Sequence, residues 1–412
     1  MDTLHTVLNR GCSIWDQTRM PEQELRQRLD QVRAGMKERN IDLLLVYGDS
    51  WKFGHLAYVS HFIPKNRGAL AVIPLEGEPA LVIQEPSRNN PFSSTLTWIK
   101  ETHSVGKFAQ GLNEALKARN LNPKRVGLAA VEEQLNIREW RELEKLLENV
   151  EWVNTGDYLS SLRLLKSPVE LSLIKEATAI LEQALARFEK IAKPGQKEYQ
   201  VMAELEREAR RRGVEDFRLL LARSSMPKVG LRPAADSALQ KGEAILIFVA
   251  ASYQRYWAEL GKTFCLGRPS EKIAKDYETA KDVFQRLVAG LSSRIQTSIP
   301  TSFLPRERER IEGGGLVEAS ASALSLGEVS APVRDSLESY GLGNGLGLDL
   351  SEEPSLSSAI KDPIKAGMVL TLRTCFTGEQ SGSALISRPY LVTESGLEPL
   401  ARIDNKLAAI GE

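Results

Sequence analysis

Residues 340–354 read YGLGNGLGLDLSEEP, with a glycine at every second position from Gly341 to Gly347. This spacing fits neither the G-x-G-x-x-G pattern nor the Walker pattern of phosphate-binding loops, and no predicted strand precedes it. Because glycine lacks a Cβ atom, such a run allows two backbone segments to approach each other closely. We therefore predict a structural role for this stretch and no nucleotide site.

Five other stretches accompany the glycine-rich one. Upstream lie SLRLLKSPVE (161–170), GEAILI (242–247) and YWAELGKTF (256–264), and downstream lie GMVLTLR (367–373) and ISRPYLVTESG (386–396). In this order and at these separations they resemble the catalytic domain of the pita-bread peptidases, the family of aminopeptidase P, prolidase, methionine aminopeptidase and creatinase. The segment before them is similar to the N-terminal domain of the aminopeptidase P and creatinase branch.

The hydrophobic patterning divides the chain in the same way. Residues 21–39 predict a helix, and the short β-rich runs that follow alternate with helical stretches, which is typical of an α/β domain. From residue 168 the pattern changes to two long amphipathic helices, followed by strands grouped around helices. We predict a creatinase-type α/β domain over residues 1–160 and an α+β pita-bread domain over residues 161–412.

Length and composition limit the class of protein. A chain of 412 residues is long enough to bury two hydrophobic cores. Its 54 basic residues equal its 54 acidic residues, so it has no net positive charge to attract nucleic acid. The three cysteines are widely spaced and form no C-x-x-C pair, which indicates a reducing compartment. With no long apolar run and no leader-like segment, we expect a cytoplasmic protein without a membrane or nucleic-acid partner.

The family resemblance implies a site of two divalent metal ions, bridged by two aspartates, one histidine and two glutamates. The residues of this chain at those five positions are, in order, Phe248, Glu259, Asn344, Arg373 and Ser387. A second histidine of the glycine-rich motif is replaced by Ser351. Only one of the implied carboxylates, Glu259, therefore remains.

Arg373 is the replacement with the largest electrostatic effect, because a guanidinium does not give up its charge. Two unit charges ~4 Å apart interact by ~4 kcal/mol at an effective dielectric constant of ~20, and a divalent ion feels about twice that repulsion. Divalent ions also need several anionic or imidazole ligands to replace their water. We therefore expect no metal and no cofactor at this site, and we expect Arg373 to pair with Glu259.

Two functional interpretations follow from these replacements. In the first, the former metal site is a Glu/Arg-lined cavity that binds a small carboxylate-bearing metabolite or a peptide. In the second, the chain is a metal-independent hydrolase or lyase acting on a C–N bond of the Xaa-Pro or creatinase-like type. Glu259 would then be the general base, and Arg373 would orient a substrate carboxylate. The structural alternative to both is a buried ion pair that fills an inherited cavity.

The residues expected to contact a ligand in either interpretation are Phe248, Asn344, Ser351, Ser387, Arg388, His55 and His61. The two histidines lie in a segment that in this family approaches the site of the partner subunit, so the resemblance also implies a homodimer. Residues 104–412 contain no histidine, which excludes the histidine chemistry of creatinase from the pita-bread domain itself. A serine nucleophile at Ser351 or Ser387 would have no local base.

Overall fold

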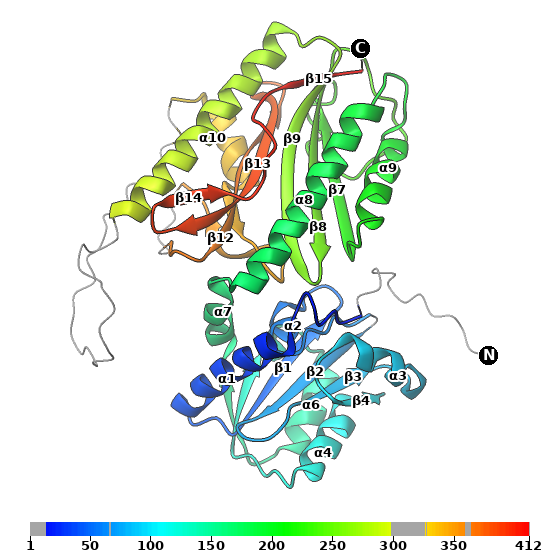
Figure 1. Cartoon of the computed structure of the whole chain (residues 1–412), viewed down its shortest axis with the longest axis vertical. Helices are drawn as coiled ribbons and strands as arrows, with labels where there is room; N and C mark the ends of the chain where they lie inside the picture. Colours follow the sequence, from blue (N-terminus) through cyan, green and yellow to red (C-terminus); the bar gives the residue numbers. More distant parts are fainter. Residues whose placement is uncertain (1–13, 66, 298–325, 327, 359–363, 412) are drawn as a thin grey trace.

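The structure is a computed structural model that describes residues 14–65, 67–297, 326, 328–358 and 364–411. Figure 1 shows two domains, the N-terminal one in blue to cyan and the C-terminal one in green to red. The predicted boundary after residue 160 falls within α7 (Gly156–Leu164), which lies between them. No helix in the described part of the chain is long and apolar enough to cross a bilayer.

The N-terminal domain is built on a six-stranded sheet with the strand order β4-β3-β2-β1-β5-β6. Its strands are β1 (Leu43–Asp49), β2 (Gly68–Pro74), β3 (Ala80–Gln84), β4 (Glu101–Val105), β5 (Arg125–Ala129) and β6 (Glu151–Asn154). Strand β1 pairs antiparallel with β2 and parallel with β5. It therefore lies inside the sheet, where its continuous apolar run is buried on both faces.

Helices cover both faces of this sheet. The longer ones are α1 (Glu22–Glu38), α2 (Gly54–Ser60), α4 (Phe108–Ala118) and α6 (Ile137–Leu146), and the shorter ones are η1 (Ser87–Asn89), α3 (Asn90–Ser93), η2 (Ser94–Leu96) and α5 (Val131–Gln134). Leu44 and Val46 of β1 belong to the cluster that contains α1 and α2, whereas Leu45 belongs to the cluster that contains α4 and α6. This alternation along β1 produces a three-layer α/β domain.

The C-terminal domain is built on a nine-stranded sheet, whose main path is β11-β10-β12-β13-β9-β8-β7. Its strands are β7 (Asp216–Arg223), β8 (Ala244–Tyr253), β9 (Tyr256–Leu266), β10 (Gly343–Gly345), β11 (Glu352–Leu356), β12 (Val369–Gly378), β13 (Gly382–Thr393), β14 (Gly396–Pro399) and β15 (Ala408–Ile410). Strand β14 pairs with β13, and β15 pairs with β9. The long antiparallel strands β8, β9, β12 and β13 form the centre of the pita-bread sheet.

Four helices pack on one face of the C-terminal sheet: α8 (Pro168–Ile191), α9 (Glu198–Arg210), α10 (Glu271–Thr297) and α11 (Ala331–Tyr340). Helices α8 and α9 bury the face formed by β7, β8 and β9, and helices α10 and α11 bury the same face at β12 and β13. The opposite, inner face carries a smaller cluster that includes Phe248 and Trp257. This inner face is where the residues predicted for the site come together.

The hairpin between β8 and β9 fixes the C-terminal domain to the N-terminal domain. At its turn, Gln254 and Arg255 both adopt positive φ angles, of 46° and 74°. The guanidinium of Arg255 donates to the Glu215 carboxylate at 2.9 Å, to the His61 carbonyl at 2.8 Å and to the Leu96 carbonyl at 3.0 Å. Because Arg255 is buried, this set of charge-assisted bonds forms a rigid link between the domains.

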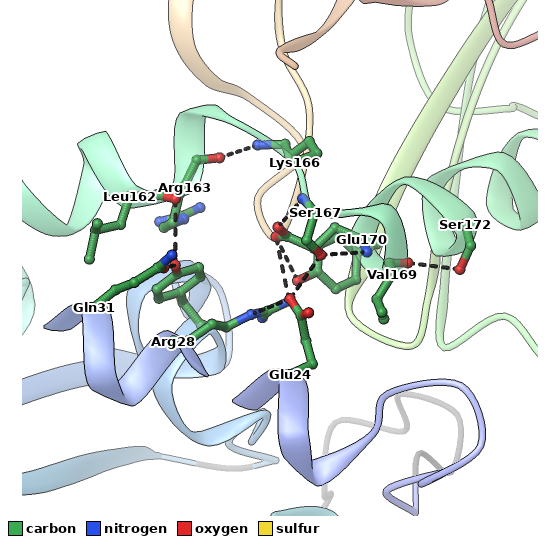
Figure 2. A network of polar contacts seen from close by, with 12 residues as sticks. Glu24, Arg28, Gln31, Leu162, Arg163, Lys166, Ser167, Val169, Glu170 and Ser172 are labelled. Carbon is green, nitrogen blue, oxygen red and sulfur yellow. Dashed lines mark hydrogen bonds and ion pairs between the residues drawn. The ribbon is translucent and has the colours of Figure 1, made fainter. Parts of the chain in front are cut away.

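A second link joins α1 to the start of α8 (Figure 2). The Ser167 hydroxyl accepts from the backbone N–H of Glu170 at 3.2 Å, and the Glu170 carboxylate accepts from the backbone N–H of Ser167 at 2.9 Å, which is a capping box. Ser167 also donates to Glu24 at 2.8 Å, and Glu24 pairs with the buried Arg28. The Tyr256 hydroxyl donates to Glu170 at 2.9 Å, so β9 joins the same network.

We predict that Arg255→Ala lowers the free energy of unfolding by about 3–5 kcal/mol, because it leaves the Glu215 carboxylate buried without a cation. Chemical denaturation monitored by tryptophan fluorescence measures the effect. The control is Arg286→Ala, which removes an exposed ion pair on α10 and should change stability by less than about 1 kcal/mol. Equal effects of the two substitutions would contradict the role given to Arg255.

Candidate functional site

Five neighbouring strands contribute the side chains that stand at the implied metal-ligand positions. They are Phe248 on β8, Glu259 on β9, Asn344 on β10, Arg373 on β12 and Ser387 on β13. Strand register accounts for part of this, because Arg373 is directly opposite Ser387, and Ser387 is opposite Gly261. Side chains alternate between the faces of a sheet, so these residues share its inner face.

Arg373 and Glu259 form an ion pair at the centre of this group. The same Glu259 oxygen accepts a hydrogen bond from the Ser387 hydroxyl at 3.2 Å. Arg373 also donates to the Asn344 side-chain oxygen at 3.3 Å, and its guanidinium carbon lies 5.4 Å from the centre of the Phe248 ring. The structure therefore brings all five predicted residues together, with one negative and one positive charge.

Burial makes this pair an internal feature of the domain. Glu259 is 1% exposed and Ser387 is fully buried, while the Arg373 side chain is 15% exposed. A carboxylate with so little access to water needs a charged partner, and Arg373 supplies it. The second guanidinium nitrogen of Arg373 donates to the Tyr340 carbonyl at 3.2 Å, which ties the pair to the end of α11.

The residues present do not fit a centre of two divalent ions. One carboxylate, one hydroxyl, one amide, one guanidinium and the phenyl ring of Phe248 occupy the five implied ligand positions, and the amide oxygen of Asn344 already accepts from Arg373. In the described ranges, no group of three or more His, Cys, Asp and Glu side chains has an arrangement that could hold a metal ion. We therefore derive no chemical step through a metal at this site.

Arg388 does not join the pair, which corrects the predicted two-arginine pocket. It follows Ser387 on β13, so its side chain leaves the opposite face of the sheet. There it donates to the carbonyl oxygens of Gly261, Ser387 and Asp404. Burial lowers the pKa of Arg388 to about 10, so it remains a cation at neutral pH. Its contacts make it a structural residue behind the sheet.

His61 also lies away from the pair. It ends α2 in the left-handed conformation, with φ of 55°, and its side chain is completely buried in the N-terminal domain. Burial, followed by the charge of the nearby Arg255, lowers the pKa of His61 well below its usual value. Because a neutral, buried imidazole has no access to a ligand, the structure does not bring His61 into the site.

His55 and Ser351 line a cavity between the two domains, with a volume of about 410 Å³. Trp257, two residues before Glu259 on β9, lines the same cavity. Neither Glu259 nor Arg373 is among its lining residues. The predicted site residues are therefore divided between a buried pair and a neighbouring open cavity.

Arg163 does not line this cavity itself, but it contacts two residues that do, His55 and Asp349. It donates to Asp349 at 2.6 Å and to the Nδ1 atom of His55 at 3.2 Å, and it also pairs with Glu352. Burial by itself raises the pKa of Glu352, but Arg163 and Lys166 outweigh it and lower the pKa to about 2. Burial and then Arg163 lower the pKa of His55 to about 3, so the imidazole is neutral.

The cluster of Arg163, Lys166 and Glu352 beside the cavity was not predicted from the sequence. Arg163 and Lys166 lie in the quoted stretch 161–170, but only as markers of the fold. Their partner Glu352 comes from a distant segment, and no sequence pattern indicates that contact. At Gly54 the structure explains the glycine, since a Cβ atom there would lie 1.9 Å from the Asp349 carboxylate. A larger residue at position 54 would therefore displace the Asp349 and Arg163 side chains from their present positions.

Comparison with known proteins gives this architecture a family. Residues 28–165 match the creatinase/prolidase N-terminal domain, and residues 172–394 match metallopeptidase family M24. An Xaa-Pro dipeptidase of Pyrococcus furiosus is 23% identical over 286 residues, which cover 67% of this chain and 70% of that relative. The predicted family and the predicted two-domain fold are thus confirmed.

Solved structures share the fold over nearly the full length. The prolidase from Pyrococcus horikoshii superimposes with a TM-score of 0.71 at 21% identity, covering 92% of this chain and 99% of that one. The X-Pro aminopeptidase from Thermotoga maritima superimposes with a TM-score of 0.74 at 19% identity, covering 93% of this chain and 99% of that one. Since the family match extends over more than half of its length, this chain belongs to metallopeptidase family M24.

Proposed function

We propose that this chain is a metal-independent member of its family that binds a small carboxylate-bearing metabolite or peptide. The observation that carries the proposal is the ion pair of Arg373 with Glu259 at the implied metal positions. A divalent ion beside Glu259 would lie close to a permanent positive charge, at a cost of several kcal/mol. Without the ions, the family's peptidase chemistry has no activated water and no electrophile.

The ligand-binding part of the proposal rests on the space beside the pair. The two terminal nitrogens of the Arg373 guanidinium already donate to Glu259, Asn344 and the Tyr340 carbonyl, and its Nε atom is buried without a hydrogen-bond partner, so little of the guanidinium is open to a ligand carboxylate. The adjoining interdomain cavity has a volume in the range of small-molecule sites and is lined by His55 and Ser351. We therefore propose the cavity as the binding region, with the ion pair buried beside it and outside its lining.

One observation favours the alternative, a metal-independent hydrolase or lyase acting on a C–N bond. The Ser387 hydroxyl lies 3.2 Å from the Glu259 carboxylate, the contact that a serine activated by a general base would make. Against it, the Glu259 oxygen that faces Ser387 is the same one that the Arg373 guanidinium contacts, so it is already engaged in an ion pair. The binding function is the better supported of the two for this reason.

Two further expectations remain proposals here. The family resemblance implies a homodimer. Light scattering coupled to size-exclusion chromatography measures the molar mass of the protein in solution and so tests this expectation. A cytoplasmic location follows from the composition and cysteine usage. Neither is needed for the chemistry of the ion pair.

We predict that the protein neither binds Mn²⁺ or Co²⁺ at this site nor hydrolyses Xaa-Pro dipeptides when these ions are added. Calorimetric titration of the metal-free protein measures the first, and release of free proline measures the second, each with and without a chelator. The family's Xaa-Pro dipeptidase from Pyrococcus furiosus serves as the positive control for the assay. Chelator-sensitive turnover by this chain would overturn the proposed function.

We also predict non-additive effects of substitutions in the pair. Arg373→Met should cost about 3–5 kcal/mol of stability, because it leaves a buried carboxylate without a partner. The double variant Glu259→Gln with Arg373→Met should recover most of that loss, since it removes both charges together. Denaturation midpoints of the wild type, the two single variants and the double variant measure the coupling. Additive losses would show that the two charges do not depend on each other.

A further inference from the structure

The interdomain cavity has aromatic side chains from both domains in its walls. Tyr47, Trp51 and Phe53 come from the end of β1 and the loop after it, and Trp257 comes from β9. Trp51 is 64% exposed, an unusual position for the largest apolar side chain. The exposed Trp51 ring offers a surface on which a flat ring can stack or which it can meet edge to face, and the buried Tyr47, Phe53 and Trp257 surround it with apolar groups.

The charges in the walls are predominantly positive. Lys52 and Arg218 both line the cavity, and within the described ranges the side chain of Lys52 forms no ion pair. Arg218 lies over the Trp257 ring at 4.6 Å and is 3.6 Å from Asp216, an arrangement that leaves donors available. The one carboxylate in the lining, Asp349, is already paired with Arg163 at 2.6 Å. The cavity therefore offers a ligand the ammonium group of Lys52, which has no acidic partner in the described ranges, and the guanidinium of Arg218, which Asp216 engages only in part.

His55 adds a directed hydrogen-bond donor. Its Nδ1 atom faces a guanidinium nitrogen of Arg163 at 3.2 Å, and a guanidinium can only donate, so Nδ1 must be the acceptor. The single proton of the neutral ring is then on Nε2, for which the described residues provide no acceptor. A histidine held in this tautomer donates to a ligand and does not act as a base.

We propose that the interdomain cavity binds a small aromatic carboxylate, with its ring against the aromatic walls and its carboxylate at Lys52, Arg218 and the Nε2–H of His55. This assignment rests on the proposed function, since it names the ligand class of that same binding region. Arg163 is a positioning residue: it holds His55 in the donating tautomer and does not itself contact the ligand.

The pH behaviour of binding distinguishes this arrangement from an ordinary histidine site. The charged groups that face His55 are Arg163 from α7, Asp349 from the glycine-rich segment and Glu352 from β11. Burial, and then the charge of Arg163, outweigh the effect of Glu352 and lower the pKa of His55 to about 3, so His55 stays neutral throughout the physiological range. We expect the affinity for a carboxylate to be constant between about pH 5 and about pH 8, whereas a titrating histidine would strengthen it below about pH 6.5.

The test is calorimetric titration of the full chain with phenylacetate, phenylacetamide and cyclohexylacetate. Phenylacetamide keeps the shape and removes the charge, so we expect it to bind about tenfold more weakly than phenylacetate. Cyclohexylacetate keeps the charge and removes the aromatic ring, and we expect a loss of about threefold or more. Equal binding of phenylacetate and phenylacetamide, or no saturable binding of either, would overturn the proposal.

Variants then locate the site. Lys52→Gln and Arg218→Gln should each weaken phenylacetate binding by about tenfold, while the control Arg286→Gln, an exposed arginine on α10, should leave it unchanged. His55→Gln retains an N–H near the position of Nε2 and should bind within about threefold of the wild type, whereas His55→Met should lose about tenfold. Unchanged binding by Lys52→Gln and Arg218→Gln would exclude the cavity.

The result of the phenylacetate titration can be distinguished from the result of the test of the proposed function. Failure of phenylacetate to bind to a protein that also shows no metal-dependent turnover would reject the aromatic-carboxylate assignment alone. Metal-dependent hydrolysis of Xaa-Pro substrates would reject the proposed function whatever the cavity binds.

Discussion

The contact between the Arg373 guanidinium and the Glu259 carboxylate determines what the inner face of the C-terminal sheet can hold. Two long strands, β9 and β12, bring these groups together inside a domain that buries Glu259 almost completely and leaves the Arg373 side chain 15% exposed. A guanidinium cannot be neutralised at physiological pH, so the contact is permanent and its net charge is zero. A metal centre at this place would have to separate two buried, opposite charges before any ion could bind.

The glycine-rich segment retains its structural function without a metal. The Asn344 amide donates to the Gly345 and Leu350 carbonyl oxygens at 2.8 and 3.1 Å, and so holds the segment in a fixed shape. Gly343 has φ of 145°, and a Cβ atom there would lie 1.8 Å from the Thr371 carbonyl oxygen. Close packing of β10 on β12 therefore requires glycine for steric reasons alone, which explains how the family fold can persist after its ligands are replaced.

The fold and the central pair could be predicted from the sequence, because both depend on the order and spacing of short motifs. Strand alternation explains why the same reasoning failed for Arg388: adjacency to Ser387 in sequence puts it on the opposite face of the sheet. The wall formed by Arg163 and His55 could not be predicted, since its residues are more than a hundred positions apart and meet only when the domains pack. Contacts of this kind follow from tertiary structure and leave no local pattern.

A crystal structure of the protein grown in the presence of Mn²⁺, with anomalous scattering recorded for that ion, tests the central claim most directly. The account predicts that no anomalous peak lies near Glu259 and that the Arg373 guanidinium remains in contact with its carboxylate. Two anomalous peaks beside Glu259, with the Arg373 side chain turned away, would contradict it.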